Sequence, residues 1–118
     1  MRDLTNLKTF IIDSKDPKEV DDAFSLELIE GKTKKLWIHI SNPCKLFLTD
    51  SKIDNDARSK SSSLYLIDQY VPMLPLEIIE KANLKQNKLS DTISASIIFN
   101  DNGSIKKIWN TRSENKTK

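Results

Sequence analysis

The feature that most constrains this chain is a loop, Asp13 to Asp22, in which carboxylate groups are crowded together. The apolar run Thr9 to Ile12 leads into Asp13, and a short polar spacer separates it from Glu19, Asp21 and Asp22. Neighbouring carboxylates repel one another, so a cation must neutralise them or water must solvate them fully. Hard cations such as Mg²⁺ prefer carboxylate oxygens and keep several of their waters. The loop therefore predicts a magnesium site.

Alternation along the strand expected over residues 22–29 separates an apolar face from a polar one. Extending the alternation backwards puts Asp22 on the apolar face and Asp21 on the opposite face. Because adjacent aspartates on a regular strand point apart, we expect direct ligation by some of the acids and water-mediated contact by the others. The alternative that the residues leave open is a solvated acidic turn with Lys15 and Lys18 as local partners.

Length and composition restrict the class of protein. A chain of 118 residues has room for one small domain, and its 31% charged and 37% hydrophobic residues make a thin core. A net charge of +2 is too small to indicate nucleic-acid binding by itself. The single cysteine, Cys44, excludes an internal disulfide and fits a reducing cytoplasm. We expect a cytoplasmic protein without a membrane segment, because no apolar stretch is long enough and no signal-peptide pattern is visible.

Hydrophobic periodicity predicts an α+β fold, mainly an antiparallel or mixed β-sheet with one or two short helices. Strands are expected over residues 8–13, 22–29, 35–41, 92–100 and 104–109. The turns at Gly31 and at the Asn102-Gly103 pair predict two hairpins.

Other segments are assigned by composition. A short helix is expected over residues 51–60, capped by Asp50 or Ser51. Residues 64–80 are expected to be ordered but winding, and the polar, basic tail at 110–118 is expected to be disordered.

The strand at 35–41 is apolar on both faces, which predicts a central position in the sheet. It contains the only histidine of the chain, His39, for which we predict a structural, hydrogen-bonded role rather than catalysis or metal binding. We predict packing roles for the two tryptophans, Trp37 and Trp109.

Several short motifs follow one another in a fixed order along the chain: Ile12-Asp13, Glu19 to Ala23, Leu36 to Ile40, Ile53-Asp54 with Ala57, Leu64-Tyr65-Leu66, and Val71-Pro72-Met73-Leu74-Pro75. This order and spacing resemble the opening part of the RNB domain, the catalytic domain of the ribonuclease II and ribonuclease R family, over residues 2–109. Glu19 and the Leu36 to Ile40 strand are similar to the cyanobacterial and plastid branch.

The resemblance implies a hydrolytic, magnesium-dependent exoribonuclease that degrades single-stranded RNA from its 3′ end to nucleoside monophosphates. It implies Asp13, Glu19, Asp21 and Asp22 as the metal ligands, with Asp21 also the catalytic acid most sensitive to substitution. It further implies that Tyr65 binds RNA by stacking near the 3′-terminal base.

The sequence also departs from the family pattern. Ser41-Asn42 replaces an Ala-Asp pair, Lys60-Ser61-Ser62 replaces an Arg-Gly-Thr stretch, and Ile67 replaces a proline. The later family motifs, which carry a glutamate, an arginine and the RNA channel, have no counterpart, nor do the flanking OB-type RNA-binding domains. We therefore expect an incomplete RNB domain that is inactive alone. A non-catalytic RNA-binding module and an inactive truncated product remain alternatives.

Overall fold

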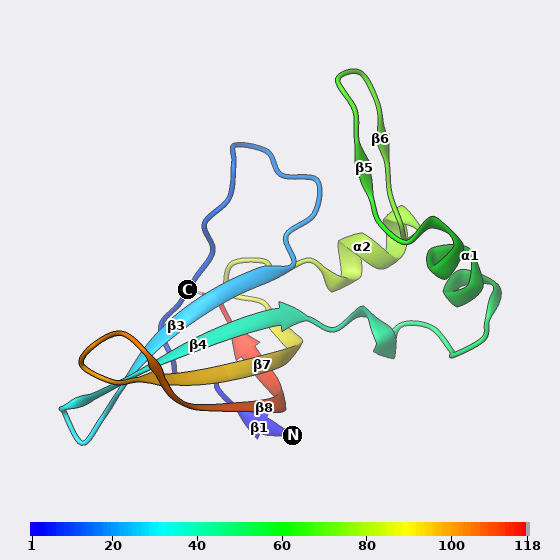
Figure 1. Cartoon of the computed structure of the whole chain (residues 1–118). Helices are drawn as coiled ribbons and strands as arrows, with labels where there is room; N and C mark the ends of the chain where they lie inside the picture. The colour runs from blue at the N-terminus through cyan, green and yellow to red at the C-terminus, as the bar shows by residue number, and fades with distance from the viewer. Residues whose placement is uncertain (118) are drawn as a thin grey trace. The chain divides into compact units, whose positions relative to one another are not determined.

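The computed structural model describes residues 1–117, which divide into two compact units (Figure 1). The first unit comprises Met1–Asn42 together with the chain from Asn83 onward, and the second comprises Pro43–Ala82. The acidic loop lies in the first unit and Tyr65 lies in the second.

The first unit is built on one sheet of six strands in the order β1-β8-β7-β4-β3-β2. The strands are β1 Arg2–Asp3, β2 Thr9–Phe10, β3 Asp22–Ile29, β4 Thr33–Ser41, β7 Leu89–Phe99 and β8 Ile105–Lys116. All neighbours pair antiparallel except β1 and β8, which are parallel. Figure 1 shows β3, β4, β7 and β8 as long, curved strands lying side by side.

Both predicted hairpins are present. Between β3 and β4, Glu30 and Gly31 have φ angles of 52° and 68°, and the Lys32 amide donates to the Ile29 carbonyl. Two consecutive positive φ angles define the tight turn whose twist matches that of the flanking strands. The second hairpin, between β7 and β8, turns at Gly103 with a φ of 84°. The sequence therefore predicted the pairing of β3 with β4 and of β7 with β8, whereas the pairing of β4 with β7 emerges only in the structure.

The two faces of the sheet reverse the usual distribution of polarity. Besides the buried Trp37, the inner face carries small polar side chains and one histidine, none more than 2% exposed: Thr9, Ser25, His39, Thr92, Ser94, Ser96, Ser113 and Asn115. The outer face carries aliphatic side chains that are 37–58% exposed: Leu26, Leu28, Ile38, Ile40, Ile93 and Ile108. Buried polar groups need hydrogen-bond partners, so the inside of the sheet depends on a polar network.

Strand β2 lies at one edge of the sheet and contacts β8, which lies next to the opposite edge. The Thr9 hydroxyl lies 2.7 Å from the Ser25 hydroxyl and donates to the Asn115 side-chain oxygen at 2.9 Å. The Leu4 amide also donates to the carbonyl of Glu114, which extends the pairing of β1 with β8. These contacts between the first ten residues and β8 curl the sheet around its polar interior.

The second unit contains a 3-10 turn, two helices and a small hairpin: η1 Pro43–Lys45, α1 Lys52–Lys60, β5 Leu64–Tyr65, β6 Tyr70–Val71 and α2 Leu76–Ala82. Ser51 caps α1, because its hydroxyl accepts the amide of Asp54. Ser61 ends the helix in the left-handed conformation with a φ of 66°. Ala57 from α1 and Ile78 and Ile79 from α2 are the buried apolar side chains.

The structure confirms the α+β class, the mainly antiparallel sheet and the capped helix at 51–60. The prediction of a disordered tail from Asn110 is wrong, because β8 continues to Lys116; Lys118 lies outside the described residues. The strand expected at 8–13 shortens to Thr9–Phe10, and the segment at 64–80 contains a hairpin and α2. No helix within residues 1–117 is long and apolar enough to cross a membrane.

Candidate functional site

The acidic loop connects β2 to β3 and presents its carboxylates to solvent. Asp13, Asp21 and Asp22 are exposed and Glu19 is half-buried. The Asp13 carboxylate accepts the amide of the next residue, Ser14, at 2.7 Å. The loop therefore offers oxygen ligands of the kind that Mg²⁺ prefers.

The second half of the loop is fixed to the rest of the sheet. The Asp21 carbonyl accepts the Ser41 amide at 2.7 Å, which places Asp21 beside the end of β4. Val20 is held on both sides, because its amide donates to the Asn83 side chain at 3.0 Å and its carbonyl accepts the Leu84 amide at 2.9 Å. The backbone that carries Asp21 and Asp22 is thus positioned before any ion binds.

The first half of the loop is not paired with the second. The β2–β3 ladder ends at the pair Phe10–Phe24, and the same register continued would place Asp13 opposite Asp21. Within residues 1–117, no three His, Cys, Asp or Glu side chains form a group that could hold a metal ion. The structure therefore keeps the four predicted ligands on one loop but does not gather them around one point.

His39 lies at the centre of the polar interior, as the sequence predicted. Its Nε2 atom lies 2.8 Å from the Ser25 hydroxyl and its Nδ1 atom 2.7 Å from the Ser94 hydroxyl. Burial lowers the pKa of His39 to about 4, so the ring is neutral at pH 7. A neutral imidazole that bonds two hydroxyls is a structural connector between β3, β4 and β7.

Tyr65 lies in the second unit, on the hairpin of β5 and β6. It pairs with Tyr70, and the two ring centroids are 5.1 Å apart with a tilt of 33°. The Tyr65 side chain is 60% exposed, so its ring is available for stacking. Its position relative to the acidic loop stays a prediction.

A second cluster, of aromatic and charged side chains, was not anticipated by the sequence reasoning. Trp37 is buried as predicted, and its indole donates to Glu27 at 2.7 Å, but Trp109 is 42% exposed rather than packed. Each tryptophan follows a lysine by two positions, Lys35 and Lys107, and each lysine lies over its tryptophan ring. This repeated Lys-x-Trp spacing, which puts cation and ring on one face of a strand, was the signal that could have found the group.

Electrostatics in this group are dominated by cations. The pKa of Glu27 is held below its ordinary value of 4.5 by the Trp37 hydrogen bond first, and also by Lys35 and Arg2. The Lys35 ammonium lies 3.4 Å from the Glu27 carboxylate. The cluster therefore contains one carboxylate, Glu27, and three cations, Arg2, Lys35 and Lys107, so its net charge is positive.

Comparison with known proteins gives a consistent assignment. The RNB domain family matches residues 1–116. Ribonuclease II, chloroplastic/mitochondrial, of Arabidopsis thaliana is 33% identical over 104 residues, which are 87% of this chain and 13% of the relative. Exoribonuclease 2 of Buchnera aphidicola is 36% identical over 104 residues, 87% of this chain and 16% of the relative.

Solved structures agree with the sequence matches. Mycoplasma genitalium RNase R in complex with ribose methylated single-stranded RNA superposes with a TM-score of 0.89 at 28% identity. The match covers 99% of this chain and 18% of that one. The chain thus spans less than a fifth of the length of these relatives, and it belongs to the RNB family of ribonucleases, in which it corresponds to the N-terminal part of the RNB domain.

Proposed function

We propose that this chain is the metal-binding part of an exoribonuclease that hydrolyses single-stranded RNA from the 3′ end to nucleoside monophosphates. The observation that carries the proposal is the match of the RNB family over residues 1–116, within which the acidic loop supplies Asp13, Glu19, Asp21 and Asp22. The similar RNase R structure holds single-stranded RNA, which supports the same class of substrate for this chain.

The acidic loop fits Mg²⁺ in chemistry, because all four proposed ligands are carboxylates that water can reach. Asp13 and Asp22 would hold the ion, and Glu19 and Asp21 would hold its waters or a second ion. Bound there, Mg²⁺ would stabilise negative charge on the phosphate and polarise the attacking water. Since the four groups do not converge in residues 1–117, binding requires the Asp13 half of the loop to approach the fixed Asp21 half.

The exposed outer face of the sheet supports the proposal that the active enzyme contains polypeptide beyond this chain. Six aliphatic side chains on that face are exposed, and contiguous apolar surface of this kind marks sites that another polypeptide covers. The curated relatives described above are also much longer than the matched region. We therefore expect the rest of an RNB domain to pack on this face and to supply the remaining catalytic groups.

A chimera tests the proposed function. Residues 1–116 would replace the matching segment of Mycoplasma genitalium RNase R, and 5′-labelled single-stranded RNA would be followed with Mg²⁺ present. The proposal predicts progressive shortening from the 3′ end with release of monophosphates, abolished by Asp21→Asn and unaffected by Asp101→Asn in the exposed β7–β8 turn. A chimera that binds RNA without shortening it would instead support the non-catalytic RNA-binding module.

A further inference from the structure

The inner face of the sheet opens into a pocket whose lining includes no residue of the acidic loop. The pocket has a volume of about 250 Å³ and is lined by Arg2, Lys35, Trp37, Ser96, Trp109, Asn110 and Thr111. All of these residues belong to the first unit. The volume is slightly below the range of about 300–1,000 Å³ that is usual for ligand pockets, so it suits a single small planar group rather than a large ligand.

The register of three strands explains why the pocket exists. Trp37 on β4 pairs with Ser96 on β7, and Ser96 pairs with Trp109 on β8. The two indoles therefore rise from one row on the same face, separated by the smallest side chain of the row. Because neighbouring strands lie about 4.8 Å apart, the two tryptophan backbones are about 10 Å apart, which leaves a slot floored by Ser96.

Cations surround this slot. The Lys35 ammonium lies 5.3 Å from the Trp37 ring centroid and 5.8 Å from that of Trp109, so it contacts both rings. The Arg2 guanidinium lies 5.1 Å from the Trp37 ring, and the Lys107 ammonium 4.4 Å from the Trp109 ring. Glu27 bonds Lys35 and Trp37, which leaves an excess of positive charge beside exposed aromatic surface.

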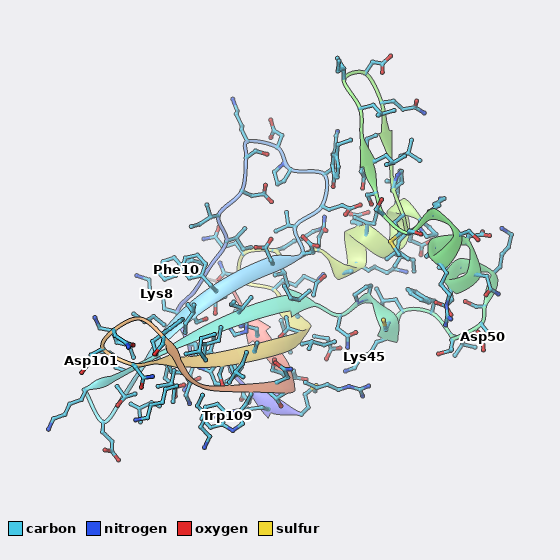
Figure 2. The ribbon with its side chains drawn as sticks, in the orientation of Figure 1. Lys8, Phe10, Lys45, Asp50, Asp101 and Trp109 are labelled. Carbon is cyan, nitrogen blue, oxygen red and sulfur yellow. The ribbon has the colours of Figure 1, made fainter. Side chains whose placement is uncertain are left out.

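The exposed Trp109 ring beside three cations matches the chemistry of a nucleotide, whereas the Trp37 ring is only 1% exposed and forms the inner wall of the pocket. The base of a nucleotide stacks on indole, and its phosphate pairs with Lys or Arg. Asn110, Thr111 and Ser96 add neutral polar groups at the wall and floor. Figure 2 shows Trp109 on the β8 side of the sheet, away from Phe10 and Lys8 on the N-terminal segment that leads into the acidic loop.

We infer that this pocket, named here the Trp37–Trp109 slot, binds one nucleotide unit of single-stranded RNA. This inference goes beyond the proposed function, because the slot includes none of the acidic ligands. Binding of RNA at the slot would require no metal ion. It would hold the RNA strand by stacking and phosphate contacts, independent of base sequence.

The two tryptophans of the chain both line the slot, so tryptophan fluorescence reports on it directly. The purified chain would be titrated with hexa-adenylate in EDTA at low salt, with AMP, adenosine and inorganic phosphate as separate arms. The inference predicts saturable quenching by hexa-adenylate and, more weakly, by AMP, and little quenching by adenosine or phosphate alone. Quenching by AMP without any by hexa-adenylate would overturn the assignment to an RNA strand.

Matched variants localise the binding, measured by anisotropy of labelled hexa-adenylate. Trp109→Leu is predicted to weaken binding about five- to 150-fold, the range expected when one stacking contact is lost. Lys107→Gln should weaken it measurably, whereas Lys106→Gln, which removes the same charge from the opposite face of β8, should not. Circular dichroism confirms folding of each variant.

Two results would overturn the inference. Equal weakening by Lys106→Gln and Lys107→Gln would show general attraction to the basic strand. Loss of binding in Asp21→Asn, or a requirement for Mg²⁺, would place the RNA at the acidic loop. The chimera tests the acidic loop separately, so the failure of one proposal is distinguishable from the failure of the other.

Discussion

The Nε2 atom of His39 lies 2.8 Å from the hydroxyl of Ser25, and neither side chain is exposed to solvent. The pair joins β4 to β3 inside the sheet, and burial lowers the pKa of His39 to about 4. A histidine held neutral in this way makes the stability of the fold depend on pH.

Stability should fall as the pH drops from 7 to 5. The unfolded chain protonates His39 near pH 6.5 and the folded chain only near pH 4, so the unfolded state binds more protons between these values. The free energy of unfolding should therefore decrease by about 2 kcal/mol between pH 7 and pH 5. Urea unfolding at the two pH values measures this change. The His39→Gln variant should lose most of the pH dependence. An unchanged pH dependence in that variant would contradict the role of His39.

Thr9→Val should destabilise the first unit. The Thr9 hydroxyl bonds Ser25 and Asn115 across the curl of the sheet, and valine of similar shape removes both of these buried hydrogen bonds. The expected loss is about 1–3 kcal/mol of unfolding free energy in urea. Thr33→Val, at the exposed start of β4, is the matched control and should change stability by less than about 0.5 kcal/mol. Equal effects would show that the hydroxyl network does not hold the sheet together.

The 118-residue chain alone should show little or no ribonuclease activity. It carries the proposed acidic ligands, but these 118 residues do not include the later glutamate and arginine that the family resemblance implies. Loss of one well-placed charge-stabilising donor typically costs about 10²–10³ in rate. Digestion of labelled single-stranded RNA, compared at equal concentration with the chimera, measures the difference; comparable rates would refute the need for the rest of the domain.

Tyr65→Ala in the chimera should lengthen or shorten the final RNA product more than it changes the magnesium requirement. The Tyr65 ring is exposed, and a stacked base loses about 1–3 kcal/mol when the aromatic ring is removed. Denaturing gels of the limit product measure its length, and Tyr65→Phe is the control that keeps the ring. A product of unchanged length in Tyr65→Ala would return Tyr65 to a packing role against Tyr70.

The parts of the fold that the sequence predicted are those with strong local signals. Strand β3 begins and ends at the predicted residues, Asp22 and Ile29, because apolar alternation runs directly into a glycine turn. The α1 helix begins after Ser51, as its capping hydroxyl indicated. Local sequence patterns were sufficient to predict a strand or helix where capping or turn residues marked both of its ends.

The parts that were missed depend on the unusual interior. Residues 110–116 appear tail-like because they are polar, but Ser113 and Asn115 are buried in an inner face that is itself polar. Hydrophobic periodicity cannot detect a strand whose buried positions are serine and asparagine. Trp109 shares a row with the buried Trp37 but is 42% exposed, against the expectation that large aromatic side chains pack in a core.

The candidate site could be predicted in chemistry but not in geometry. Carboxylate type and spacing pointed to Asp13, Glu19, Asp21 and Asp22 as candidate metal ligands, an assignment that stays a prediction. Whether they converge depends on how far the β2–β3 ladder extends, and it ends at Phe10–Phe24, before the acids. Repulsion between carboxylates opposes closing that ladder, and the proposed cation would offset this repulsion.

Magnesium binding to the isolated chain is the sharpest test of the acidic loop as a metal site. In an amide NMR titration with Mg²⁺, we expect saturable shifts confined to residues 11–23, abolished by Asp22→Asn and retained in Asp101→Asn. The loss follows because Asp22 is a proposed direct ligand, whereas Asp101 lies in the distant β7–β8 turn. The absence of saturable shifts in the loop, or equal shifts at Asp101 and Asp22, would contradict the claim that the acidic loop is the metal site of an RNB ribonuclease.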